Sequence, residues 1–207
     1  MRTNPFHLLL ALLCSSAAAV AAPSPLFDGK SFDGWEGDVT KTWRIEEGAL
    51  VGGTVTGEVP RNEFLATKKS FENFELRLKC KLVGTEGFVN AGIQIRSRRI
   101  PNHHEMIGYQ ADMGEGYWGS LYDESRRDKM LATADKELVS KTVKAGEWVD
   151  YRIRCEGRRV QIWINGVQTV DYTESDEKIE QSGQIAVQIH GGGRAEAWYK
   201  EITIEEL

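Results

Sequence analysis

The residues best suited to chemistry lie in three segments, "NAGIQIR" at 90–96, "GYQADM" at 108–113 and "QIAVQIHGGG" at 184–193. Apolar and polar residues alternate in each, so a strand there would bury one set and present the other. Amide side chains in the presented set suit hydrogen bonding to a ligand with many hydroxyl groups. We therefore expect one polar, ligand-binding face that carries Asn90, Gln94, Arg96, Gln110, Asp112, Gln188 and His190.

Proton transfer on this face would need titratable groups. Asp112 is the leading candidate base, because a carboxylate beside Gln110 on a shielded face would have a raised pKa. His190 is the alternative base or the acid. Arg96 could stabilise a developing oxyanion, and Glu124 in "LYDES" could be the acid. The structural alternatives are a salt bridge between Arg96 and Asp112, a strand-end histidine, and a solvated turn at Glu124.

Aromatic residues and glycines follow directly after "GYQADM". Tyr117, Trp118 and Tyr122 could form an apolar wall for the CH faces of a sugar ring, with glycines permitting close backbone approach. The amides do not titrate near neutral pH, so we expect them to bind rather than to move protons. The expected binding residues are Asn90, Gln94, Gln110, Tyr122, Trp118 and Gln188.

Two histidines and a carboxylate, His103, His104 and Glu105, raise the question of a metal site. Adjacent residues of an extended segment point in opposite directions, so both imidazoles would seldom bind one ion. A site through His104, His190 and Asp112 stays open. The sequence predicts no organic cofactor and leaves a divalent metal undetermined.

The elements that must position these residues are strands. "FENFELRLKCKLV" at 71–83 and "WVDYRIRCEG" at 148–157 alternate between apolar and charged residues, and Asn165-Gly166 predicts a two-residue hairpin. Residues 129–144 alone look helical, and they are expected to cover one end of the domain after a solvated charge run at 123–129. The pattern predicts an all-β sandwich, with further strands at 88–97, 106–113, 184–190 and 198–205.

The first 21 residues have the layout of a secretory signal peptide, with Arg2, an apolar run and a final Ala19-Val20-Ala21. Cleavage would leave a single domain at 22–207, and loss of the Arg2 charge would take the net charge from -5 to -6. Lipid anchoring through Cys14 is the weaker alternative, because Leu13 is large for a lipoprotein signal. We expect a secreted or periplasmic protein.

Two classes of protein are excluded, and one question about cysteine stays open. No later apolar run reaches the roughly 18 residues of a membrane helix, and no basic cluster indicates nucleic acid binding. Cys80 and Cys155 both fall on the inward side of predicted strands. A disulfide and two buried free thiols are therefore both open.

The chain resembles the 3-keto-disaccharide hydrolase family over nearly all of 22–207. The stretches that carry the resemblance are "LFDGKSFDGWEG", "NEFLATKKSFENFELRLKCKL", "NAGIQIR", "GYQADMGEGYWGSLYDE", "GEWVDYRI", "WINGVQTVDYTE", "GQIAVQIHGG" and the closing strand. The resemblance implies a concanavalin A-like, laminin-G-like jelly-roll sandwich of two antiparallel sheets. It also implies export and a small carbohydrate substrate, a glycoside whose C3 hydroxyl has become a ketone. An upstream sugar 3-oxidoreductase would supply that substrate.

A C3 ketone acidifies the hydrogen on C2, so a base can remove it and the C1 substituent can leave before water adds back. This chemistry, a hydrolase or lyase reaction, would use Asp112, His190, Arg96 and Glu124. A non-catalytic carbohydrate-binding domain would need the same amides and aromatic residues but no base. A conventional glycosidase, with Asp112 and Glu124 as its two carboxylates, is the third alternative.

Overall fold

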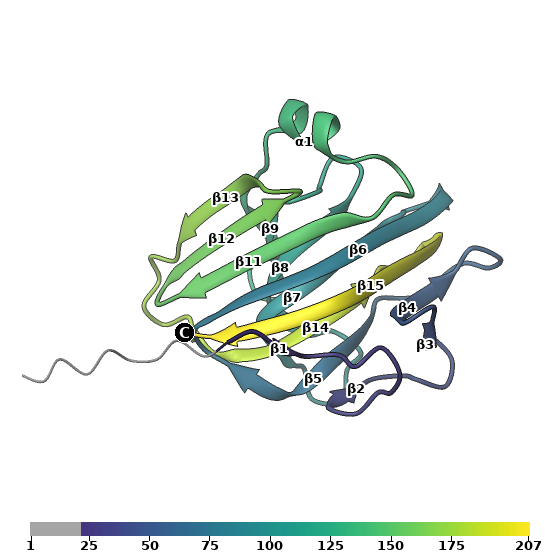
Figure 1. Ribbon diagram of the computed structural model, residues 1–207, viewed down its shortest axis with the longest axis horizontal. Helices are drawn as coiled ribbons and strands as arrows, with labels where there is room; N and C mark the ends of the chain where they lie inside the picture. Colours follow the sequence, from purple (N-terminus) through teal and green to yellow (C-terminus); the bar gives the residue numbers. More distant parts are fainter. Residues whose placement is uncertain (1–21) are drawn as a thin grey trace, which may run out of the picture.

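The computed structural model describes residues 22–207, which form two packed antiparallel sheets (Figure 1). The proposed signal peptide and Cys14 lie outside the described residues. This architecture confirms the predicted all-β sandwich of two antiparallel sheets.

Sheet A has eight strands and forms one layer of the sandwich. Its spatial order is β13 (Val167–Thr173), β12 (Arg159–Ile164), β11 (Val149–Glu156), β6 (Phe74–Gly87), β15 (Gly193–Glu206), β4 (Ala49–Thr54) and β3 (Trp43–Glu46), with β1 (Ser24–Pro25) paired to β15. Sheet B has seven strands, in the order β10 (Lys129–Ala132), β9 (Leu121–Glu124), β8 (Met106–Gly114), β7 (Asn90–Arg99), β14 (Gly183–Ile189), β5 (Glu63–Phe71) and β2 (Trp35–Glu36).

The core lies between the inner faces of the two sheets. The alternation predicted for β6 is confirmed, because Leu76, Leu78 and Cys80 are buried in the core while Arg77 is exposed. From sheet B, Ile93 and its inward neighbours on β7, β8 and β14 pack into the same cluster. The residues that alternate with these core residues therefore lie on the opposite, outer face of sheet B.

The predicted hairpin at Asn165-Gly166 joins β12 to β13. The φ angles of these two residues are 47° and 80°, and two consecutive positive values are the mark of a type I′ turn. Asn165 also ties the hairpin to β11, because its side-chain oxygen accepts from the Asp150 backbone N–H at 2.8 Å.

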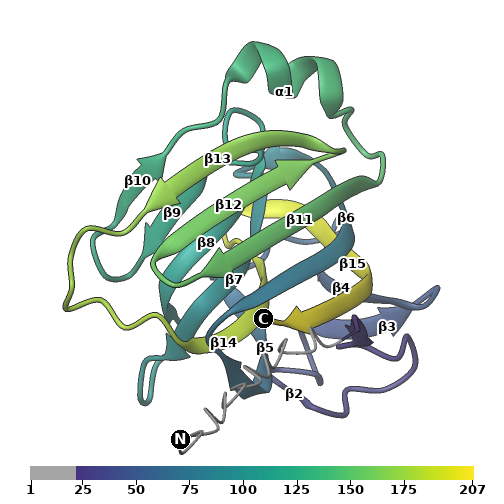
Figure 2. The same cartoon turned by 60° about the vertical axis from the view of Figure 1, so that its left-hand side comes forward.

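The helix prediction for 129–144 is partly wrong. Helix α1 spans only Lys136–Thr142, where the Asp135 carboxylate caps it by accepting from the Glu137 and Leu138 backbone N–H groups. The earlier residues instead form β10, because they complete the edge of sheet B by pairing with β9. Figure 2 shows α1 above one end of the sandwich, the place expected for it. No helix in residues 22–207 has the length and apolar character needed to span a membrane.

The two cysteines of the described chain are free thiols. Cys80 lies on β6 and Cys155 on the neighbouring strand β11. They do not face each other, because Cys80 is opposite Val149 and Cys155 is opposite Phe74. Cys80 and Phe74 are roughly 20 Å apart along β6 at the usual strand rise, which is far beyond disulfide reach. The disulfide alternative is therefore wrong. Burial raises the pKa of Cys155 to about 12, so its thiol stays protonated.

Candidate functional site

The outer face of sheet B carries most of the polar set expected from the sequence. In the pairing of β7 with β8, Gln94 lies opposite Gln110 and Gly92 lies opposite Asp112. In the pairing of β14 with β7, Gln188 lies opposite Gly92. The structure thus places Gln188, Gly92 and Asp112 in one row across three neighbouring strands.

A directed chain of hydrogen bonds runs along this face to Asp112. The Ser97 hydroxyl donates to Gln94 Oε1, Gln94 Nε2 donates to Gln110 Oε1, and Gln110 Nε2 donates to Asp112 Oδ1, each at 2.7 Å. All four residues are buried. When Asp112 is ionised, its carboxylate can only accept, and every amide in the chain is then held in one orientation.

Gly92 makes room for this chain. A Cβ atom at position 92 would lie 2.5 Å from Gln110 Cδ. The Gln110 side chain therefore occupies the space that the side chain of any residue other than glycine at position 92 would need. The glycine of "NAGIQIR" therefore has a packing role rather than a turn role. It brings the Gln110 amide between Gln94 and Asp112.

Asp112 is a shielded carboxyl group with little freedom to move. Burial raises its pKa to about 7, and the hydrogen bond from Gln110 opposes that rise. Its backbone is fixed on the other side, where its carbonyl accepts from the Tyr151 hydroxyl at 2.6 Å. The raised pKa expected for this residue is thus present, and the group can take or release a proton near neutral pH.

Glu124 is a second carboxyl group with a raised pKa, and it is half-buried where Asp112 is buried. It lies on β9 opposite Gly108, and its pKa is raised to about 7 by burial, then by the charges of Glu105 and Asp112. Tyr122, two residues earlier on the same face, lies opposite Gln110. Near pH 7 one carboxyl of the pair can be protonated while the other is ionised, an arrangement that serves as an acid and a base.

Two buried polar atoms near these carboxyl groups have no hydrogen-bond partner within residues 22–207. They are Gln188 Oε1 and Glu105 Oε2. Gln188 Nε2 makes only a long contact, 3.5 Å, to Glu124 Oε2. Because an unpaired buried polar atom costs free energy, these atoms are suited to bonds with a bound ligand.

His190 and Asn90 extend the face beyond the Asp112 row. His190 donates its backbone N–H to the Asn90 carbonyl, and Asn90 lies opposite Gly114. His190 Nδ1 is 2.7 Å from the Gly191 carbonyl, which can only accept, so Nδ1 carries the proton of the neutral ring. The lone pair is then on Nε2, and His190 can act as a base through that atom.

Arg96 does not lie on the polar face, so its predicted position is wrong. The register shifts between Ile95 and Arg98, and Arg96 has a φ angle of 49°, so the alternation of β7 breaks there. Its guanidinium instead donates to the backbone carbonyls of Glu72 and Gly157. The alternative of a salt bridge to Asp112 is wrong for the same reason.

Trp118 is also separate from this face. Its ring packs 6.3 Å from that of Tyr151, which belongs to the core, and it lines a pocket of about 600 Å³ between the β8–β9 turn and α1. The proposed metal ligands are not brought together either. Within residues 22–207, no three His, Cys, Asp or Glu side chains form a group that could hold a metal ion.

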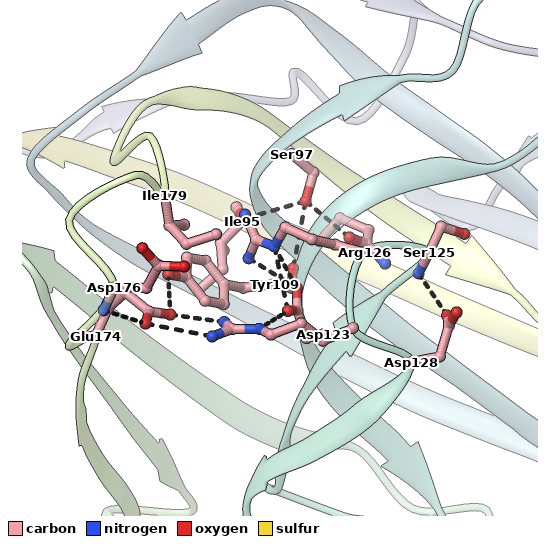
Figure 3. Close-up of polar contacts among 12 residues, drawn as sticks. Ile95, Ser97, Tyr109, Asp123, Ser125, Arg126, Asp128, Glu174, Asp176 and Ile179 are labelled. Atoms are coloured by element: carbon pink, nitrogen blue, oxygen red, sulfur yellow. Dashed lines mark hydrogen bonds and ion pairs between the residues drawn. The ribbon is translucent and has the colours of Figure 1, made fainter.

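A buried ion-pair network lies behind the site, where the charge run at 123–129 had predicted a solvated loop. Asp123 is fully buried and binds both Arg126 and Arg127, and Arg127 continues to Glu174 at 2.6 Å. Tyr109 donates its hydroxyl to Glu174 at 2.8 Å. Figure 3 shows Tyr109, Asp123, Arg126 and Glu174 grouped together. The alternation of "LYDE" is the signal that could have indicated this inward position.

The network bears on the site through β9. Asp123 points inward between Tyr122 and Glu124, whose backbone partners on β8 are Gln110 and Gly108. Anchoring Asp123 therefore fixes the strand that presents both neighbours on the outer face. Asp123 and Glu174 are positioning residues of the candidate site.

Comparison with known proteins gives a family and a fold. Residues 22–205 match the family described as the 3-keto-alpha-glucoside-1,2-lyase-like domain. No curated protein matches the sequence. A proposed glycosyl hydrolase from Parabacteroides distasonis is similar in structure at a TM-score of 0.68, with 20% identity over 89% of this chain and 94% of that one.

Two further solved structures share the architecture. A carbohydrate-binding module from Bacillus subtilis has a TM-score of 0.63 and 15% identity, covering 84% of this chain and 96% of its own. A protein of unknown function with a galectin-like fold, also from Bacillus subtilis, has a TM-score of 0.64 and 12% identity, covering 91% and 96%. At these identities the likeness concerns the jelly-roll fold.

Proposed function

The chain belongs to the 3-keto-alpha-glucoside-1,2-lyase-like family, and on that premise we propose that it is an exported enzyme that cleaves 3-keto-glycosides. The observation that carries the proposal is a pair of carboxyl groups on one face, buried Asp112 and half-buried Glu124, each with a pKa raised to about 7. Such a pair supplies a base and an acid at neutral pH. Export is part of the proposal and rests on the sequence of residues 1–21.

The proposed reaction begins at C2 of the keto sugar. Ionised Asp112 takes the C2 proton, and the electrons of that bond form an enolate with the C3 oxygen. With Arg96 turned away, the amide donors of Asn90 and Gln188 are the groups left to stabilise the enolate oxygen. The C1–O bond then breaks as Glu124 gives its proton to the leaving oxygen. The product is an enone, and addition of water to it completes a hydrolysis.

His190 is the second candidate for the base. Its free Nε2 lone pair suits proton removal, and it lies at the end of the same face. Asp112 is preferred because the hydrogen-bond chain from Ser97 ends on it and fixes its orientation. A base held in one geometry can be placed against a single substrate hydrogen.

Non-catalytic sugar binding is the competing function, and the similarity to a carbohydrate-binding module favours it. Such a domain would use the buried amides and Tyr122 in the same way. Yet it would gain nothing from two carboxyl groups held near neutral pKa, since burying them costs free energy. The carboxyl pair therefore favours catalysis.

The test is a comparison of two substrates with the chain that begins at residue 22. A 3-keto-glucoside and the matching unoxidised glucoside are incubated with the protein, with and without chelator, and products are followed by mass spectrometry. Cleavage of the keto compound alone supports the proposal. Binding of both without cleavage would instead support a carbohydrate-binding domain, and cleavage of the unoxidised glucoside would support a conventional glycosidase.

Gly92→Ala tests the hydrogen-bond chain. The new methyl group would displace Gln110, so Asp112 would lose its amide donor, and roughly tenfold lower kcat/KM is expected, the value of one hydrogen bond to a charged group. Because that hydrogen bond lowers the pKa of Asp112, the low-pH limb of the rate profile should also move upward. Gly57→Ala is the matched control, since its Cβ would meet only Thr54 at 3.9 Å. If the two variants had equal kcat/KM and the same low-pH limb of the rate profile, the role of the hydrogen-bond chain would be contradicted.

A further inference from the structure

Two exposed aromatic side chains stand together at one end of the sandwich. Phe88 is 42% exposed and Tyr117 is 39% exposed, and their rings lie 6.1 Å apart with an interplanar angle of 80°. Only three other large hydrophobic side chains in residues 22–207 are exposed, namely Val39, Val55 and Leu207. Single exposed hydrophobic residues are ordinary on a protein surface, but a paired, perpendicular arrangement is a candidate binding surface.

The pair continues the polar face. The Phe88 ring is 4.6 Å from the His190 ring, and His190 is bonded to Asn90. Tyr117 lies in the turn that begins at Gly114, the partner of Asn90 on β8. Gly114 is two residues beyond Asp112 on β8, roughly 7 Å at the usual strand rise, so the turn that carries Tyr117 begins close to the Asp112 row.

Hydrogen bonds fix the backbone segments that carry the two rings. Phe88 donates its N–H to the Gly192 carbonyl at 2.9 Å, and Tyr117 donates to the Gly114 carbonyl at 3.0 Å. A Cβ at position 193 would lie 2.4 Å from the Phe88 carbonyl oxygen, so glycine at that position lets the two turns approach. Because the two backbone segments are already ordered, binding on this surface costs little backbone entropy.

We propose that Phe88 and Tyr117 form a binding platform for a second ring, the one carried by the leaving group at C1 of the substrate. The proposal rests on the function proposed above and names the two residues that would distinguish a ring-bearing leaving group from a small one. Two perpendicular aromatic rings form a corner that takes the apolar face of a six-membered ring against one wall and its edge against the other. An aryl ring and a pyranose share this apolar face.

The test compares leaving groups with and without a ring. The kcat/KM of wild type and the double variant Phe88→Ala/Tyr117→Ala is measured with methyl 3-keto-glucoside, phenyl 3-keto-glucoside and a 3-keto-disaccharide. Loss of the platform should lower kcat/KM for the phenyl substrate, the disaccharide or both by roughly tenfold and leave the methyl substrate within roughly twofold. Val55→Ala, at an exposed hydrophobic residue with 44% exposure, should change none of the three.

Two outcomes overturn the proposal. In one, the double variant loses the same factor in kcat/KM on all three substrates; in the other, it keeps the wild-type kcat/KM on both ring-bearing substrates. A binding measurement separates this inference from the proposed function. Unoxidised phenyl glucoside should bind wild type more tightly than methyl glucoside does, and the double variant should lose that preference. If no keto substrate is cleaved, the proposed function fails, and this binding comparison still decides whether the platform exists.

Discussion

Asp112→Asn is expected to reduce turnover of a 3-keto-glycoside by roughly 10² to 10⁴-fold, the usual contribution of a positioned general base. Asparagine has the same shape and its side-chain oxygen can still accept from Gln110 Nε2, so the hydrogen-bond chain should survive. It cannot take a proton, however. The measurement is kcat with the keto substrate, beside the control Asp33→Asn, which changes an exposed carboxylate. A loss of less than threefold would remove Asp112 from the base role.

The same substitution should change how stability depends on pH. The pKa of Asp112 is about 7 in the folded protein against 3.8 as its ordinary value, so the folded state holds a proton that the unfolded state releases. Its stabilising contribution is therefore full below pH 3.8 and is lost as the pH rises to about 7. Asp112→Asn should remove this loss and raise the melting temperature relative to wild type more at pH 8 than at pH 4.

Glu174→Ala is expected to lower the free energy of unfolding by roughly 3 to 5 kcal/mol, the cost of breaking a buried ion pair and leaving its partner unpaired. Burial alone would raise the pKa of Glu174, but bonds from Arg127, the Asp176 N–H and Tyr109 outweigh it and hold the pKa at about 2. For a chain of this size such a loss corresponds to a melting temperature lower by roughly 6 to 20 °C.

The pH dependence of this second effect has the opposite sign to that of Asp112. A lowered folded pKa stabilises the protein above the ordinary value of 4.5, and that contribution disappears as the pH falls toward 2. Wild type and Glu174→Ala should therefore differ most near pH 7 and least near pH 2. Glu177→Ala, an exposed carboxylate in the same connection, is the control. Equal melting temperatures for the two variants at pH 7 would contradict the role of the network.

Strand alternation was sufficient to predict much of the candidate site. In β7, β8 and β14 a period of two separates core residues from Gln94, Gln110, Asp112 and Gln188, so local sequence places the four on the outer faces of their strands. Their meeting also depends on the pairing of β14 with β7, two strands far apart in the chain, which alternation does not specify. The hydrogen-bond chain depends on pairing as well, because Gln110 fills the space above Gly92 only when β8 lies beside β7.

The incorrect predictions concern residues whose positions depend on contacts with parts of the chain that are distant in sequence. At Arg96 the alternation breaks where Gly183 of β14 crosses, since a Cβ at 183 would lie 2.6 Å from the Arg96 carbonyl carbon. Asp123 was placed in a solvated loop because its neighbours Arg126 and Arg127 are charged, and its distant network member Glu174 belongs to another part of the chain. Trp118 lies within the β8–β9 turn, and the sequence does not specify the direction of that turn.

The central claim is that Asp112 removes the C2 hydrogen of a 3-keto-glycoside. The most direct measurement uses a substrate with deuterium at C2 and follows the label in the cleaved sugar by mass spectrometry in ordinary water, with uncleaved substrate as the control for spontaneous exchange. Loss of the label from all cleaved product, with slower cleavage than for the unlabelled substrate and far slower cleavage by Asp112→Asn, is the result expected here. Cleaved sugar that retains its deuterium would contradict the account.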